Sequence, residues 1–195
     1  MRARLLTVLL AAASAAPAQQ LLRDDFAYAG PLTSNGWFAH SSGGQRTIVS
    51  FGDYAILQQA TGAGEDINRP FPQIAAAQTI YASFHLRVPS GSPVNPPAAG
   101  LYFAHFKDGT TGFRARTGLL APASGGAFRL GIHADNASLA GGAAWPQDLA
   151  FDTDYTVVIS YTASTGTAEL WLDPVAAGSP KITHTGTLLG QFMSG

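Results

Sequence analysis

Alternating apolar and polar positions mark the clearest strands of this chain. In residues 78–88 every second side chain is aliphatic or aromatic, and the series between them runs Tyr-Ser-His-Arg. Residues 155–162 alternate in the same way and lead through a Ser-Thr-Gly turn into residues 167–173. Because successive side chains of a strand point to opposite faces, a period of two indicates one buried and one solvated face. These three segments are therefore predicted strands with a core face.

One hairpin is central to the predicted fold. Its two apolar arms, residues 101–107 and 113–119, flank an Asp-Gly sequence that tolerates the positive φ of tight turns. In the second arm, the alternation places Arg114 and Arg116 together on the solvated face. In the first arm both faces are partly apolar, which indicates a central strand and allows His105 to point inward.

Shorter apolar segments between turn residues extend the pattern. They predict strands at residues 22–26, 46–51, 54–58 and 127–134, with Gly52-Asp53 as the turn between the second and the third. About ten short strands, and no amphipathic helix of useful length after the first twenty residues, indicate an all-β protein. The predicted architecture is an antiparallel two-sheet sandwich.

The first twenty residues predict a secretory signal peptide. Arg2 and Arg4 precede an apolar run, and Ala16-Pro17-Ala18 fits a cleavage site. The run is shorter than the roughly 20 residues that a membrane-spanning helix needs, so no membrane span is predicted. We therefore expect a signal peptide over residues 1–20 and one secreted, extracellular or cell-surface domain over residues 21–195.

Composition narrows the function classes. The chain has 11 basic residues, two of them in the predicted signal, against 12 acidic ones, and this mildly acidic balance argues against a nucleic-acid partner. With no cysteine, neither disulfides nor thiolate metal sites are available. Stability must come from packing.

Several short segments together resemble a known family. They are Asp25-Phe26, Gly36-Trp37, GEDINRPF (64–71), IYASF (80–84), YFAH (102–105), GFRAR (112–116), YTVVISY (155–161) and LWLDP (170–174). In this order they resemble the LamG-like, concanavalin A-like jelly-roll modules of large secreted bacterial surface proteins. The resemblance implies a jelly roll, an extracellular setting and often no enzymatic activity.

The same resemblance raises a question about the C-terminal end of the domain. Such modules usually finish with a strand that carries an Asp-Glu-hydrophobic motif, which this chain lacks. Residues 181–192 contain at most one weak predicted strand. Either these residues close the sandwich, or the domain lacks its final strand.

Catalytic patterns argue against an enzyme. Glucanases of this fold place two Glu and an Asp at alternate positions of one strand, whereas Glu65 and Glu169 are the only glutamates here and lie far apart. The nucleophile elbow G-x-S-x-G is also absent from the sequence. The five histidines lack metal-site spacing, so packed or hydrogen-bonded roles are favoured for them. They are His40, His85, His105, His133 and His184.

For the acidic residues of the loop, a structural role is favoured over a ligand-binding role. Glu65, Asp66 and Arg69 lie between Gly and Pro residues, where an ion pair would pin the loop. No cofactor is predicted. The alternative is a calcium ion bound by Glu65 or Asp66 together with carbonyl oxygens. A second candidate calcium site is a group of three aspartates, for which solvated turn residues are the favoured interpretation. That group is Asp148, Asp152 and Asp154.

Ligand-binding candidates come from aromatic and planar polar side chains, which suit stacking on sugars. Tyr102, Trp145, Arg114 and Arg116 are the candidate residues, and Trp37 and Trp171 are further aromatics of this kind. Trp145 is flanked by glycines and a proline, although burial in the core is its favoured interpretation.

Three functions are compatible with these observations. The first is a non-catalytic secreted or cell-surface jelly-roll module for adhesion or architecture, and the alternative is a lectin-like carbohydrate-binding module, calcium-assisted or not. A glycoside hydrolase is the least favoured. The partners expected are an extracellular polysaccharide or a surface protein.

Overall fold

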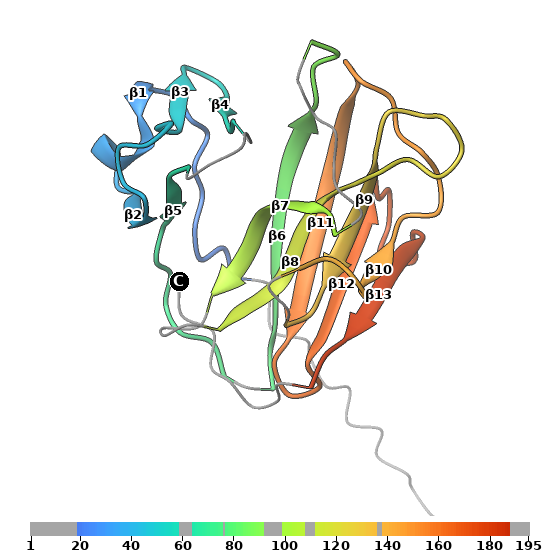
Figure 1. Cartoon of the computed structure of the whole chain (residues 1–195). Helices are drawn as coiled ribbons and strands as arrows, with labels where there is room; N and C mark the ends of the chain where they lie inside the picture. Colours follow the sequence, from blue (N-terminus) through green and yellow to red (C-terminus); the bar gives the residue numbers. More distant parts are fainter. Residues whose placement is uncertain are drawn as a thin grey trace, which may run out of the picture.

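The computed structural model describes residues 19–58, 64–75, 77–91, 99–107, 112–135 and 138–187. Within these ranges the protein is all-β, with thirteen strands and a single 3₁₀ turn, η1 (Leu32–Ser34) (Figure 1). The described residues contain no helix that is long and apolar enough to cross a membrane. Residues 1–18 of the predicted signal peptide and the hairpin turn at 108–111 lie outside the described residues.

Two four-stranded antiparallel sheets form a β-sandwich. One sheet has the order β10-β9-β8-β7 and the other β13-β12-β11-β6. Their strands are β6 (Thr79–Arg87), β7 (Leu101–Lys107), β8 (Phe113–Leu120), β9 (Arg129–His133), β10 (Ala143–Ala144), β11 (Asp154–Thr162), β12 (Thr167–Leu172) and β13 (Lys181–Thr185). The core lies between the sheets, where Leu130 and Ile132 of one meet Val157, Ile159 and Leu170 of the other.

A smaller N-terminal lobe, residues 24–58 and 64–69, lies beside the sandwich, next to β7 (Figure 1). It contains a three-stranded sheet with the order β1-β3-β4 and the two-stranded sheet β2-β5. The strands are β1 (Ala29–Pro31), β2 (Phe38–Ser41), β3 (Val49–Phe51), β4 (Ala55–Ile56) and β5 (Asp66–Asn68).

Most predicted strands are confirmed. The alternating segments form β6, β11 and β12, and the two predicted hairpins form the pairs β7/β8 and β3/β4. The weak strand predicted in residues 181–192 is β13, which pairs with β12. The strand predicted at residues 22–26 is wrong, because the first strand begins at Ala29 and the positive φ of Phe26, 53°, interrupts an extended backbone there.

The prediction that Arg114 and Arg116 share a solvated face is also wrong. Their exposed fractions are 2% and 3%. Between Phe106↔Arg114 and Ala104↔Thr117, β8 contains one residue more than β7, so the strand has a β-bulge. Ala115 has a φ of 49° at this bulge, and the period-two pattern breaks there.

Candidate functional site

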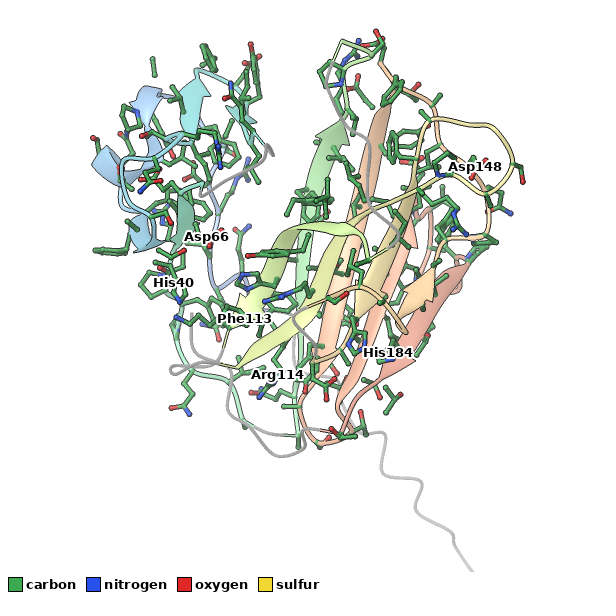
Figure 2. All side chains as sticks on the ribbon, viewed as in Figure 1. His40, Asp66, Phe113, Arg114, Asp148 and His184 are labelled. Atoms are coloured by element: carbon green, nitrogen blue, oxygen red, sulfur yellow. The ribbon has the colours of Figure 1, made fainter. Side chains whose placement is uncertain are left out.

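The predicted residues Tyr102 and Arg116 meet at the contact between the N-terminal lobe and the sandwich. The Arg116 guanidinium carbon lies 4.2 Å from the centre of the Tyr102 ring and 4.5 Å from that of Phe113. His105 lies edge-on to Phe113 with the ring centres 4.8 Å apart, and His40 of β2 approaches the same ring at 6.0 Å (Figure 2). We call these five residues the lobe junction.

Burial dominates the electrostatics of the lobe junction. It is the largest cause of the low pKa of His105, about 4; the nearby Arg116 also lowers this pKa, while a hydrogen bond to the Phe106 carbonyl oxygen opposes the shift. Because Arg116 is covered and His105 is neutral at physiological pH, this cluster packs the lobe against β7 and β8. The ligand-binding candidates Tyr102 and Arg116 thus lie next to each other, but their contact is part of the packing between the lobe and the sandwich.

The other two sequence candidates lie apart from this cluster. Trp145 packs against the hydrophobic core and donates its backbone N–H to the Leu130 carbonyl oxygen at 2.8 Å. Arg114 is fully buried, and its Nη1 donates to the Phe113 carbonyl oxygen at 3.1 Å. Both positions point to packing roles.

The predicted acidic loop is pinned by hydrogen bonds. Glu65 is 7% exposed, and its two carboxylate oxygens accept the N–H groups of Gly44 at 3.0 Å and Ile48 at 3.1 Å. Asp66 accepts the Ser41 hydroxyl at 2.6 Å. The ion pair predicted for Arg69 within this loop is formed instead with Asp24, at 2.8 Å.

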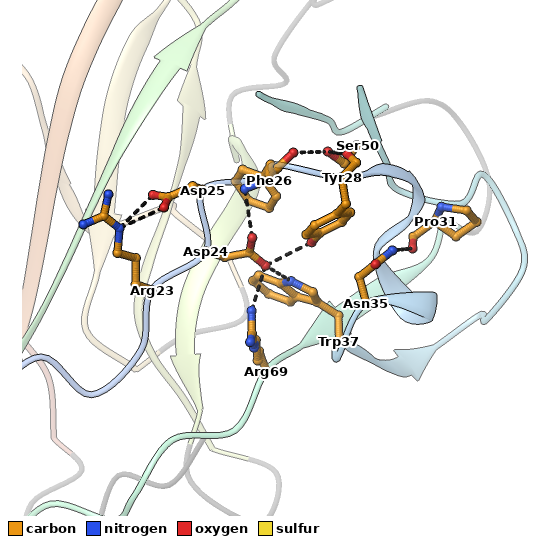
Figure 3. Close-up of polar contacts among 10 residues, drawn as sticks. All are labelled: Arg23, Asp24, Asp25, Phe26, Tyr28, Pro31, Asn35, Trp37, Ser50 and Arg69. Carbon is orange, nitrogen blue, oxygen red and sulfur yellow. Dashed lines mark hydrogen bonds and ion pairs between the residues drawn. The ribbon is translucent and has the colours of Figure 1, made fainter. Parts of the chain in front are cut away.

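Asp24 is the polar centre of the lobe (Figure 3). Its Oδ1 accepts the Phe26 N–H at 2.9 Å, and its Oδ2 accepts the Trp37 indole N–H at 2.7 Å, the Tyr28 hydroxyl at 3.0 Å and the Arg69 guanidinium at 2.8 Å. Burial raises the pKa of Asp24, but these donors outweigh it and hold the pKa below its usual value. With four donors around one carboxylate, the group is structural.

The aspartates proposed as calcium ligands accept hydrogen bonds from other groups of the protein. Asp148 accepts the N–H groups of Ala123, Ser124 and Gly126 at 2.7, 2.6 and 3.0 Å. A cavity of about 500 Å³ lies beside it. The remaining candidates accept elsewhere, Asp152 from the Ser90 N–H and Asp154 from Arg87, both at 3.3 Å. Across the described ranges, no group of three or more His, Asp or Glu residues is arranged to hold a metal ion.

The most exposed aromatic side chain of the described residues, Tyr81, lies on the outer face of the sheet β13-β12-β11-β6, beside Trp171, which is 8% exposed. Tyr81 of β6 is 62% exposed, and its ring centre lies 6.2 Å from that of Trp171 on β12. Val158 of the intervening strand pairs with Trp171 across the ladder. A shallow cavity of about 400 Å³ is lined by Tyr81, Val158, Trp171 and residues 174–177, and we call it the Tyr81 groove.

An anchored turn forms one wall of the Tyr81 groove. The Asp173 carboxylate accepts the Thr156 N–H at 2.6 Å, which fixes the turn to β11. The Ser179 hydroxyl then accepts the N–H groups of Val175 and Ala176 at 3.0 and 3.1 Å. These bonds hold Val175 95% exposed at the groove.

Polar and charged groups surround the Tyr81 groove. Lys181 forms an ion pair with Glu169, and its ammonium lies 5.1 Å from the centre of the Trp171 ring. Further along the same face, His85 Nδ1 and the Thr156 hydroxyl lie 3.3 Å apart. The Tyr81 groove thus combines an apolar lining with charged and polar groups close by.

Sequence reasoning missed Tyr81, although the signal was present. The alternation that predicts β6 puts Tyr81 in the polar series, so an aromatic side chain on a solvated face was visible in the pattern. Trp171 was among the aromatic candidates. Lys181 could not be found, because its place beside Trp171 depends on the register of β13 against β12.

Comparisons with known proteins identify no relative. Searches with protein-family models, among curated proteins and among solved structures found no match to this chain.

Proposed function

We propose that this protein is a non-catalytic, lectin-like module that binds carbohydrate at the Tyr81 groove. The observation that carries the proposal is the 62% exposed Tyr81 ring next to Trp171 and the groove. An aromatic ring offers a flat apolar face to the C–H face of a sugar, while neighbouring polar groups bind its hydroxyls.

The carboxylates near the groove favour binding over hydrolysis. Glycoside hydrolysis needs two carboxyl groups at a defined separation across the scissile bond. Glu169 is instead ion-paired with Lys181, and Asp173 accepts the Thr156 N–H. Adhesion or architecture at a cell surface remains compatible with this activity, since polysaccharide binding would supply the adhesive contact.

The proposed setting is a secreted jelly-roll module of the LamG-like, concanavalin A-like kind. Its support is the ordered set of segments that resemble those modules, the signal-like first twenty residues, and a chain path that changes sheets. β6 and β7 belong to different sheets, and the chain returns between β10 and β11. Such crossings between two antiparallel sheets are typical of Greek-key and jelly-roll sandwiches.

A glycan array with and without calcium tests the proposed function. We expect the protein to bind a restricted set of glycans, and Tyr81→Ala to weaken that binding at least tenfold, about 1.4 kcal/mol. The matched control is Tyr54→Ala, because Tyr54 is a comparably exposed tyrosine (52%) on the N-terminal lobe. Tyr54→Ala should bind like the wild type.

The same array decides the part played by calcium. Binding that is equal in calcium and in chelator assigns recognition to the groove side chains alone, whereas binding only with calcium makes the module calcium-assisted. No retained glycan in either condition, or equal binding by Tyr81→Ala and the wild type, would overturn the proposed function.

A further inference from the structure

Two ion pairs lie on the face that carries the Tyr81 groove, while the nearby Asp173 carboxylate accepts a backbone N–H. Lys181 pairs with Glu169, and Arg87 pairs with Asp154 at 3.3 Å. Arg87 and Asp154 are direct ladder partners. Lys181 and Glu169 are diagonal neighbours instead, since Lys181 is the ladder partner of Trp171 and Glu169 that of Thr183.

The Lys181–Glu169 pair lies at the groove, where it can influence a ligand. The Lys181 ammonium is 5.1 Å from the ring centre of Trp171, which lines the groove. The two side chains are 42% and 21% exposed, so both charges reach the surface. An anionic ligand would have to compete with Glu169 for Lys181 and would be repelled by Glu169 itself.

We propose that the Tyr81 groove selects uncharged saccharide chains and that Glu169 is the residue that rejects acidic ones. This inference rests on the proposed carbohydrate-binding function and adds the class of ligand to it. A neutral chain stacks on Tyr81 and hydrogen-bonds the rim without disturbing the ion pair. A uronic-acid chain meets a cation that is already neutralised and a carboxylate that repels it.

Glu169→Gln tests the role of the ion pair directly. Glutamine keeps the size of the side chain and an oxygen that can accept from Lys181, but removes the negative charge. We expect this variant to gain three- to tenfold in affinity for polygalacturonate at about 0.1 M salt, with the affinity for neutral β-glucans within twofold of the wild type. Because the gain is electrostatic, it should disappear in high salt.

Asp154→Asn is the matched control. It changes the net charge by the same amount on the same sheet face, next to Arg87. Arg87 lies six residues along β6 from Tyr81, about 20 Å at strand rise, which is beyond the Debye length of about 10 Å at 0.1 M salt. The control should gain no affinity for polygalacturonate.

A double variant shows which cation captures the acidic chain. If Glu169→Gln acts by releasing Lys181, adding Lys181→Met should remove the gain. A gain that persists in the double variant, or that appears equally in Asp154→Asn, would overturn the role given to the pair. Melting curves of each variant confirm that the fold is retained.

The outcomes separate this inference from the proposed function. Wild-type protein that binds neutral glucans and polygalacturonate equally, with both lost in Tyr81→Ala, overturns the selection of neutral chains and leaves carbohydrate binding in place. Binding of neutral chains alone, with a gain for polygalacturonate in Glu169→Gln, supports both. Wild-type protein that binds neither polymer and no glycan of the array overturns both.

Discussion

The N-terminal lobe leaves several of its large apolar side chains in solvent, whereas most of those of the sandwich are buried. Phe38, Phe51 and Tyr54 of the lobe are 58%, 55% and 52% exposed. In the sandwich, Phe128 and Leu130 are both 0% exposed and belong to one contiguous core. The lobe therefore gains much less from the hydrophobic effect than the sandwich does.

Buried carboxylates connect the segments of the lobe. Asp24 accepts four donors and Glu65 accepts two backbone N–H groups, and together they connect segments far apart in the sequence. Such bonds are directional and depend on the carboxylate being ionised. The stability of the lobe should thus respond to charge, and that of the sandwich to volume.

The largest expected effect is the loss of core volume in the sandwich. Phe128 contacts the rings of Phe151 and Tyr155, with ring centres 5.9 and 6.4 Å apart, so Phe128→Ala leaves a cavity. We expect the free energy of unfolding to fall by about 3–5 kcal/mol, measured by urea denaturation. Val175→Ala, at a 95% exposed apolar position, should change it by less than about 0.5 kcal/mol. Equal effects of the two substitutions would contradict the volume argument.

A smaller effect is expected from removing the charge that organises the lobe. Asp24→Asn keeps the shape of the side chain but leaves the Arg69 guanidinium and the Trp37 indole with a weaker acceptor. We expect a loss of about 2 kcal/mol that is confined to the lobe, since breaking a partly buried charged pair strands its partner. The change should appear first in the fluorescence of Trp37, before the sandwich unfolds.

The neighbouring carboxylate supplies the control for Asp24. Asp25 pairs with Arg23, but both side chains are more than half exposed, at 61% and 67%. Asp25→Asn should therefore cost less than about 0.5 kcal/mol, because exposed ion pairs contribute little. If Asp25→Asn and Asp24→Asn destabilise the lobe to the same extent, the lobe is not held by the buried carboxylate.

The same contrast explains what the sequence could predict. The sandwich strands β6, β11 and β12 follow from alternation alone, because a period of two and a common core determine which side chains are buried. The lobe depends on contacts across the sequence: Arg69 pairs with Asp24, 45 residues away, and not with the acidic residues beside it. Nothing in the local pattern indicates that choice.

The candidate site residues likewise differ in whether the local sequence pattern could predict them. Tyr81 could have been found from the polar series of its strand, whereas burial of Arg116 could not. Its position depends on one extra residue in β8 and on the hydrogen bond from the Ala115 N–H to the Ala134 carbonyl oxygen, at 3.0 Å. A bulge of this kind re-aims side chains without a sequence signature that alternation would detect.

A pH-dependent effect is expected at the lobe junction, where the two regions meet. Burial holds the pKa of His105 at about 4, below the 6.5 of the unfolded chain, so between these values only the unfolded state binds the proton. Stability should therefore fall as pH drops from 6.5 to 4, by up to about 1.4 kcal/mol per pH unit. Burial also lowers the pKa of His133, which adds a contribution of the same sign. Denaturation at pH 7, 6 and 5 should give a flatter dependence of stability on pH for His105→Gln than for the wild type. Equal slopes in the two proteins would show that protonation of His105 is not coupled to unfolding.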